Sequence, residues 1–406
     1  MKTTLTLLAF LLAACAADNA QVVPAATGGA ATFNYSVRYS QTADFYGNSL
    51  GDQQRAVASG DLHYMNGSER LPFAADYGGG YMWTIAGPAY LNGLFQRLLL
   101  SQGIDWRKWK VTASDNVSYR PSDAATDFSG IPGIGEPIGG SGPNPPSDES
   151  ILALKTHILS NAASGNVEHT LNYATSVTAG AASDLLRYPD GDGLDINQLM
   201  ANAQLTRRLN ARNSLTGTYT FSQYSYPDFS FSFQSNTGLF GFRRAWNAKI
   251  SSVISAGPEW KGSSDSARVP SSITYAVNAA ANYRYRSVEA SLTFVRAASN
   301  GGGYLFGAET DSASANYTRE FRKMLTLGVT ADYRHLSGLI DNGVTNSKFG
   351  GAQVTRQFGR HFTAFASYTA IDQSSSSQLP DNALNTVVQV IGFGVSYSPR
   401  KIHLVD

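Results

Sequence analysis

Apolar and polar residues alternate along much of this chain, and the pattern is clearest near its C-terminal end. In the segment QVIGFGVSYSPR, Ile391, Phe393 and Val395 share one face of a strand, while the opposite face carries glycine and serine. The same two-residue period recurs in 271–285 and in 323–336. Each of these segments therefore predicts a β-strand with one apolar face and one face that is polar or small.

Strand-like segments follow one another from residue 194 onward, and most of them run 11 to 16 residues. This is about twice the usual strand of ~5–6 residues, and it exceeds the ~9–11 residues that a tilted strand needs to cross a bilayer. The clear segments are 194–209, 213–226, 229–244, 247–260, 271–285, 287–298, 308–320, 323–336, 346–358, 361–373 and 384–398. Weaker candidates are 31–42, 53–66, 69–84, 90–102, 105–119, 163–174 and 175–188. The total is eighteen, or sixteen if the irregular early segments are discounted.

Short and long connections alternate between these segments. Turns such as NAR (210–212) and YRS (285–287) are short and basic, whereas NGGGYLFG (300–307) and QSSSSQLPDN (373–382) are longer. Outer-membrane barrels show this asymmetry, with short periplasmic turns and longer external loops, and a Greek-key sandwich has no reason to. We therefore expect an all-β fold, a transmembrane antiparallel up-and-down β-barrel of about 16–18 strands over residues 31–398. The last strand would pair with the first, and the apolar strand faces would contact lipid.

The two ends of the chain have other roles in this interpretation. Residues 1–20 have one basic residue, an apolar run and small residues after it, which predicts a signal peptide followed by a linker over 21–30. Cys15, the single cysteine, lies in LAAC and resembles the lipidation site of bacterial lipoproteins. The alternative is ordinary cleavage a few residues later, which would remove Cys15. Residues 399–406 form a C-terminal tail.

Composition and charge narrow the function classes. Charged residues make up only 15% of the chain, and Lys+Arg 31 against Asp+Glu 30 leaves a net charge of +1, so a nucleic-acid partner is not expected. The six histidines are scattered without metal-ligand spacing, and no seryl or acidic partner recurs at a meaningful offset. We therefore expect no metal, no cofactor and no catalytic site, and not an enzyme.

One link breaks the strand pattern. Residues 120–162 form a long Gly/Pro-rich segment on the external side, and such loops are usually functional or disordered. Its end predicts a short helix capped at Ser147 or Asp148, with Ile151, Leu152, Leu154 and Ile158 on one face. The segment either folds into the lumen, where Asp148, Glu149 and Lys155 would line the passage, or stays a surface loop.

Charged residues within the predicted strands are further candidates for the pore. Arg284, Asp332 and Arg334 fall on the polar faces of their strands, where they would act as an electrostatic filter. The alternative role, for those near strand ends, is anchoring at the level of the lipid headgroups.

Several phrases of the chain are similar to those of a known family. The sequence resembles the large predicted outer-membrane β-barrel proteins of Gram-negative bacteria, the β-barrel porin family. The phrases are VTASDNVSYRP (111–121), LLRYPDGDGLD (185–195), SAGPEW (255–260), SDSARVPSS (264–272), GGAQVTRQFGRHFTAFASYTA (350–370) and GFGVSYSPRKIHL (392–404). The resemblance implies the fold and a place in the bacterial outer membrane, and it implies little about the solute.

The final strand also resembles the C-terminal signal by which outer-membrane proteins are recognised for assembly. Gly392, Val395 and Tyr397 take the places of that signal, although nine residues follow Tyr397. The expected partners are outer-membrane lipid, the barrel assembly machinery and small hydrophilic solutes that cross by passive diffusion. The alternative function is a barrel component of an export machinery for a polysaccharide or another polymer.

Overall fold

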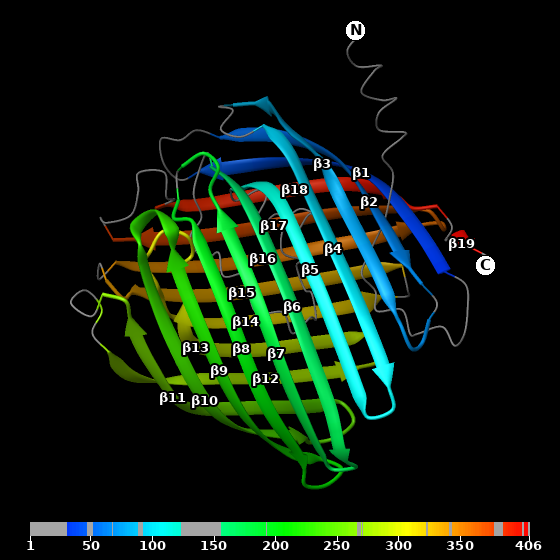
Figure 1. The fold of residues 1–406 in the computed structure, drawn as a ribbon. Helices are drawn as coiled ribbons and strands as arrows, with labels where there is room; N and C mark the ends of the chain where they lie inside the picture. The colour runs from blue at the N-terminus through cyan, green and yellow to red at the C-terminus, as the bar shows by residue number, and fades with distance from the viewer. Residues whose placement is uncertain are drawn as a thin grey trace.

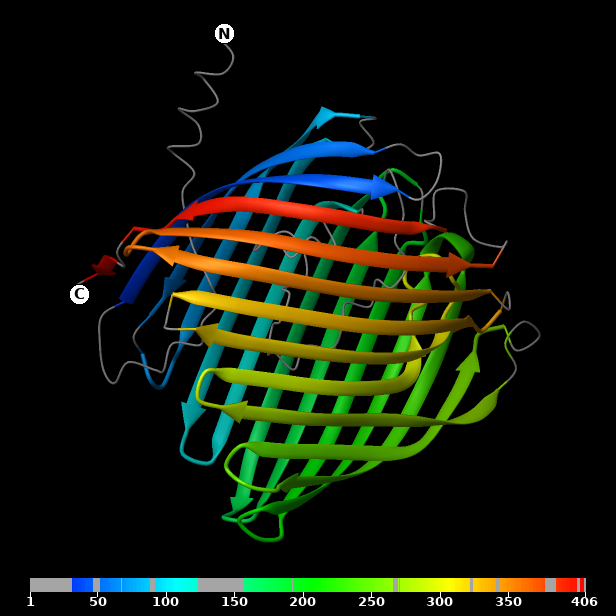
Figure 2. The ribbon, with the colours of Figure 1, turned by 180° about the vertical axis from the view of Figure 1, so that it is seen from behind.

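The strands of the chain close into one antiparallel barrel (Figures 1 and 2). The computed structural model describes residues 31–46, 52–66, 68–87, 92–122, 156–191, 193–265, 269, 271–321, 324–340, 343–376, 385–399 and 402–404. Eighteen long strands each pair with their neighbours in chain order, and β18 returns to β1. The prediction of an up-and-down barrel is confirmed, at the upper of the two strand numbers.

The strands are close to the predicted segments in most places. The first nine are β1 (Ala31–Tyr46), β2 (Gln53–Met65), β3 (Phe73–Ala86), β4 (Gly93–Trp106), β5 (Trp109–Ser122), β6 (Thr156–Asn172), β7 (Thr175–Arg187), β8 (Ile196–Arg208) and β9 (Asn213–Tyr226). A short 3-10 helix, η1 (Pro227–Phe229), precedes β10 (Phe231–Ala245), β11 (Ile250–Ser263), β12 (Ser272–Tyr285), β13 (Val288–Ser299) and β14 (Ala308–Phe321). The remainder are β15 (Leu325–Gly338), β16 (Val344–Phe358), β17 (Phe362–Ser375), β18 (Val387–Tyr397) and the short β19 (Ile402–Leu404).

The first and last strands close the cylinder. The β1–β18 ladder runs from Val37 paired with Tyr397 to Tyr46 paired with Val388. Closure leaves no free sheet edge between them, so their backbone groups are satisfied without water. Beyond the last long strand, β19 pairs with the start of β1, so the predicted tail contains a short strand.

The two faces of β18 differ as the sequence predicts. Ile391 is 46% exposed, Phe393 55% and Val395 51%, while Val388 and Val390 on the other face are buried. In β15, the Thr330 hydroxyl donates to Asn316 Oδ1 at 2.8 Å on the inner face, and the neighbouring Val329 points outward. The apolar faces therefore form an outer belt, as expected for a barrel in lipid.

Asparagine side chains build several short turns. Asn210 Oδ1 accepts hydrogen bonds from the backbone N–H groups of Arg212 and Asn213 in the β8–β9 turn. Asn247 Oδ1 does the same for Lys249 and Ile250 before β11. These Asx turns satisfy backbone donors locally, which explains why an Asn opens the NAR and NAK turns of the sequence.

The start of β6 corrects one sequence prediction. The strand begins at Thr156, seven residues earlier than predicted, so Ile158 lies in a strand and not on a helix. Ile158 pairs with Arg120 of β5, and its side chain is buried on the inner face. Cross-strand pairing and this burial outweigh the helical spacing of its apolar neighbours. The other residues of the predicted helix lie outside the described residues.

No helix in the described part of the chain is long and apolar enough to span a membrane.

Candidate functional site

The wall of the barrel opens between β12 and β13 at one end of these strands. Their ladder ends at the pair Val277–Arg296, although β12 begins at Ser272 and β13 continues to Ser299. Beyond this point β13 remains paired with β14, as far as Ser299 with Ala308. The segment Ala297–Thr310, which we call the β13–β14 tip, therefore leaves β12 at the external end of the barrel.

The β13–β14 tip turns into the lumen. The Tyr224 hydroxyl donates to the carbonyl of Ala298 at 3.3 Å, and the Tyr226 hydroxyl donates to the carbonyl of Asn300 at 2.8 Å. Tyr219 faces outward, and Tyr224 and Tyr226 lie an odd number of residues further along β9. Because successive side chains of a strand point to opposite faces, both tyrosines point into the barrel. Because β9 lies four strands from β13 around the ring, the tip crosses the inside of the wall and narrows the mouth.

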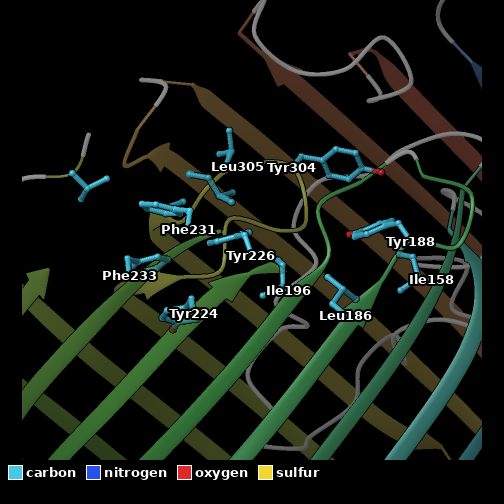
Figure 3. Close-up of a cluster of buried hydrophobic side chains, with 13 residues drawn as sticks. Ile158, Leu186, Tyr188, Ile196, Tyr224, Tyr226, Phe231, Phe233, Tyr304 and Leu305 are labelled. Carbon is cyan, nitrogen blue, oxygen red and sulfur yellow. The ribbon is translucent and has the colours of Figure 1, made fainter. Parts of the chain in front are cut away.

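An apolar cluster holds the tip in this position (Figure 3). Tyr304 and Leu305 at the turn pack among side chains from the inner faces of β6 to β10. Leu305 is only 2% exposed, and burial of one such side chain contributes about 2 kcal/mol. The buried cluster consists of Ile158, Leu186, Tyr188, Ile196, Tyr224, Tyr226, Phe231, Phe233, Val269, Tyr304, Leu305, Ala308 and Leu336.

Glycines let the tip approach the wall closely. Gly303 has a φ of +81°, which non-glycine residues rarely adopt, and a Cβ there would overlap the ring of Tyr188. The Gly303 carbonyl accepts a hydrogen bond from Leu194 N at 2.7 Å, which ties the tip to the β7–β8 link. The following Phe306 packs edge-on against Phe229 of η1. The turn is therefore bound to both the β7–β8 link and η1.

Glu259 replaces the missing strand partner at the base of the tip. Its Oε1 accepts the backbone N–H of Ala298 at 3.0 Å and the hydroxyl of Ser235 at 2.8 Å, while Oε2 accepts the hydroxyl of Thr274 at 3.3 Å. Glu259 is 1% exposed. A side chain of β11 thus satisfies a donor of β13 that would otherwise pair with β12.

Ion pairs surround this carboxylate. Lys261 Nζ lies 2.7 Å from Glu309 Oε2, and Arg296 pairs with both Glu309 and Asp311, the latter at 2.8 Å. The Arg296 guanidinium also lies over the ring of Tyr275, 4.7 Å from its centroid. Removal of one member of a buried network leaves the others uncompensated, so the group acts as a clamp on the split.

The structure places two of the predicted wall residues beside the tip. Asp332 and Arg334 lie on the inner face of β15 with their side chains 3.2 Å apart and largely buried. Two residues further along the same face, Leu336 belongs to the apolar cluster. Arg284 instead lies near the periplasmic turn, where it is 80% exposed and pairs with Glu289 at 2.6 Å. Their role in conduction remains a prediction.

The other predicted site residues, Asp148, Glu149, Lys155 and the lipidation candidate Cys15, lie outside the described residues. Sequence reasoning missed the tip, because it treated NGGGYLFG as one more polar external link. Three consecutive glycines followed by Tyr304, Leu305 and Phe306 were the available signal. Large apolar side chains in an external loop need a surface against which to pack.

A second part of the inner wall carries buried ion pairs. Arg55 lies 3.5 Å from Asp44, and Arg38 lies 3.5 Å from Asp61, all on the inner faces of β1 and β2. These strands are nearly half the ring away from β9 and β10. The inner wall therefore has an apolar side that receives the tip and a charged side across from it.

Comparisons with known proteins show the fold. No protein-family model matches the chain, and no curated protein matches it. OccK2 (OpdF) of Pseudomonas aeruginosa has a TM-score of 0.50 at 12% identity, covering 91% of this chain and 99% of its own. The same protein in complex with glucuronate has a TM-score of 0.49 at 11% identity, covering 93% and 100%. OccAB4 of Acinetobacter baumannii has 0.48 at 10% identity, covering 93% and 99%.

The chain thus has the fold of outer-membrane porins, and the resemblance drawn from the sequence is confirmed at that level. A closed barrel of eighteen long strands with an apolar outer belt is suited to the bacterial outer membrane.

Proposed function

We propose that this protein is a channel for the passive diffusion of small hydrophilic solutes across the outer membrane, narrowed at its external mouth by the β13–β14 tip. A barrel of this strand number encloses a lumen wider than its own side chains can fill. The tip is the observation that carries the proposal, because it adds a fixed constriction to that lumen.

The character of the wall supports hydrophilic solutes. Inward positions that do not belong to the apolar cluster carry hydroxyl, amide and charged side chains of both signs, such as the Asp332–Arg334 and Arg38–Asp61 pairs. Side chains of this kind replace part of the hydration shell of a polar solute and hinder apolar ones. The loop at 120–162, with Asp148, Glu149 and Lys155, is proposed as a second pore-lining element.

Conductance of the purified protein in planar bilayers tests this function. We expect steady single-channel currents, with a larger conductance when residues 300–307 are replaced by a two-residue Asn-Gly turn. An eight-residue Gly/Ser replacement is the matched control for length, and it should give a noisy current because its turn is not anchored. A folded barrel that conducts no ions would contradict the channel. A folded variant with unchanged conductance would contradict the constriction.

Deletion of residues 125–155 tests the second element in the same assay. If the segment lies in the pore, conductance rises and ion selectivity relaxes while the barrel still assembles. If conductance is unchanged in the folded deletion, the segment lies outside the pore. The comparison with the tip variant would show which of the two elements limits flow.

A further inference from the structure

The outward-facing charges of the described strands are distributed unevenly. Asp115 lies near the middle of its strand, six residues from the start of β5 and seven from its end. On the described strands, the other acidic and basic residues at outward positions lie within four residues of a strand end, where headgroups and water are near. Those residues are Arg187, Arg207, Arg244, Arg319, Lys348, Arg356 and Asp372. Arg296, Glu309 and Asp311, at the β13–β14 tip, belong instead to the ion-pair network with Lys261.

Asp115 faces the hydrocarbon region. It pairs in the sheet with Leu100 of β4 and Ala163 of β6, and it shares the outward face of β5 with Tyr119. Tyr119 stacks on His157 near the external end, with ring centroids 5.5 Å apart. Four residues of a tilted strand correspond to about 10 Å of depth, so the carboxyl lies well below this aromatic level.

The carboxyl has one polar neighbour on the same face. Asn161 Nδ2 donates to Asp115 Oδ1 at 2.6 Å, and no cation contacts Asp115 within the described part of the chain. Asn161 retains a second amide hydrogen, and the carboxylate retains further acceptor positions. Polar groups at this depth are costly in contact with acyl chains unless another protein surface pairs with them.

The strands on either side of this pair differ in shape. On β3 and β4 the outward side chains are large, including Tyr77, Tyr81 and Leu98. On β7 and β8 the outward side chains near mid-strand are small, including Ala181 and Ala201, and the larger Leu185, Leu199 and Leu205 lie toward the strand ends. A groove of about 530 Å³ continues this small side across β7 to β10, lined by Val177, Ala203, Leu205, Gly217, Tyr219 and Phe240.

We propose that the outer face of β3 to β8 binds a second copy of this chain about a two-fold axis along the membrane normal, beside Asp115 and Asn161. Such an axis keeps identical residues at equal depth, so Asn161 of each copy can donate to Asp115 of the other. It also sets the large side chains of β3 and β4 against the small ones of β7 and β8. An unrelated partner would need a donor and an acceptor at this depth by coincidence, whereas a second copy supplies both.

Cysteine cross-linking in native outer membranes tests the surface. Ala163→Cys lies beside the proposed axis, and Ala331→Cys is the matched control, an outward alanine in the middle of β15 on another part of the ring. The unsubstituted protein measures any contribution of Cys15. With a short bifunctional thiol reagent, we expect a covalent product of twice the chain mass from Ala163→Cys and not from Ala331→Cys. No such product, an adduct with a different protein, or equal dimer from both variants would overturn the proposal.

The polar pair is tested separately by native mass spectrometry of the folded protein in detergent. We expect the wild type to be dimeric and the double variant Asp115→Leu/Asn161→Leu to lose at least ten-fold in dimer fraction, with heat-modifiable migration showing that it is folded. Gln41→Leu is the control, since outward Gln41 already donates to the Tyr39 hydroxyl at 2.7 Å. A monomeric wild type, or a double variant that remains dimeric, would overturn the proposal. Single-barrel conductance reports the channel function independently.

Discussion

Two halves of the same hairpin are held by different forces. From Val288 to Arg296, β13 lies in the wall, paired with strands on both sides and exposed to lipid. From Ala297 onward it loses β12 and is held instead by Glu259, the ion pairs around it and the apolar cluster. Lipid tolerates no unpaired backbone, whereas in the lumen side chains and water can take the place of a strand. A strand pair can therefore leave the wall only beyond the hydrocarbon region, as the β13–β14 tip does.

The largest expected effect is on barrel assembly, and it distinguishes the lipid face of a strand from its inner face. Val329→Arg places a charge on the lipid face near the middle of β15 and should cost ~2–4 kcal/mol and impair assembly. Thr330→Arg, one residue along on the inner face, should assemble and alter conductance. A folding assay in lipid vesicles gives the comparison, and equal tolerance of the two changes would contradict the assignment of faces.

The next effect breaks the tip and leaves the wall intact. Leu305→Ala removes a fully buried side chain and should cost about 2–4 kcal/mol of tip anchoring, seen as a noisier and larger current. Leu292→Ala on the lipid face of β13 is the matched control and should leave the current unchanged. Protease cleavage within 300–307 reports release of the turn. A quiet, wild-type current from folded Leu305→Ala would show that the cluster does not fix the tip.

A smaller effect tests the clamp at the split. Glu259→Gln keeps the shape of the side chain but weakens its bonds to Ala298 N and Thr274, at a cost of about 1–3 kcal/mol. We expect the single-channel current of Glu259→Gln to fluctuate briefly in the open state. Glu289→Gln, which changes the Arg284 pair at the other end of the barrel, should show none. Fluctuations in both variants, or in neither, would contradict the role of Glu259 in holding the base of the tip.

The smallest effect concerns selectivity. Arg334→Gln leaves the Asp332 carboxylate beside the tip without its charged partner and should shift the reversal potential towards cation preference by a few millivolts at low salt. Arg284→Gln, near the exposed periplasmic turn, is the control and should shift it less. Reversal potentials in a salt gradient measure both. A larger shift from Arg284 would place the filter at the periplasmic end.

The sequence by itself determined the barrel. The two-residue period of segments such as 323–336 fixes which side chains face lipid, and the alternation of short and long links fixes the order of strands, because both are local properties. A closed barrel also requires the last strand to pair with the first, and in the structure Tyr39 of β1 pairs with Val395 of β18. The strand number was predicted to within one hairpin.

Only the tertiary structure decided where the chain departs from that regular wall. Ile158 lies in a strand, the NGGGYLFG turn lies in the lumen, and Asp115 accepts a hydrogen bond from Asn161 on the outer face. Each depends on contacts between segments far apart in the sequence, such as Tyr226 with Asn300, 74 residues away. Alternation of polar and apolar residues describes one strand and its two faces, so it carries no information about such pairings.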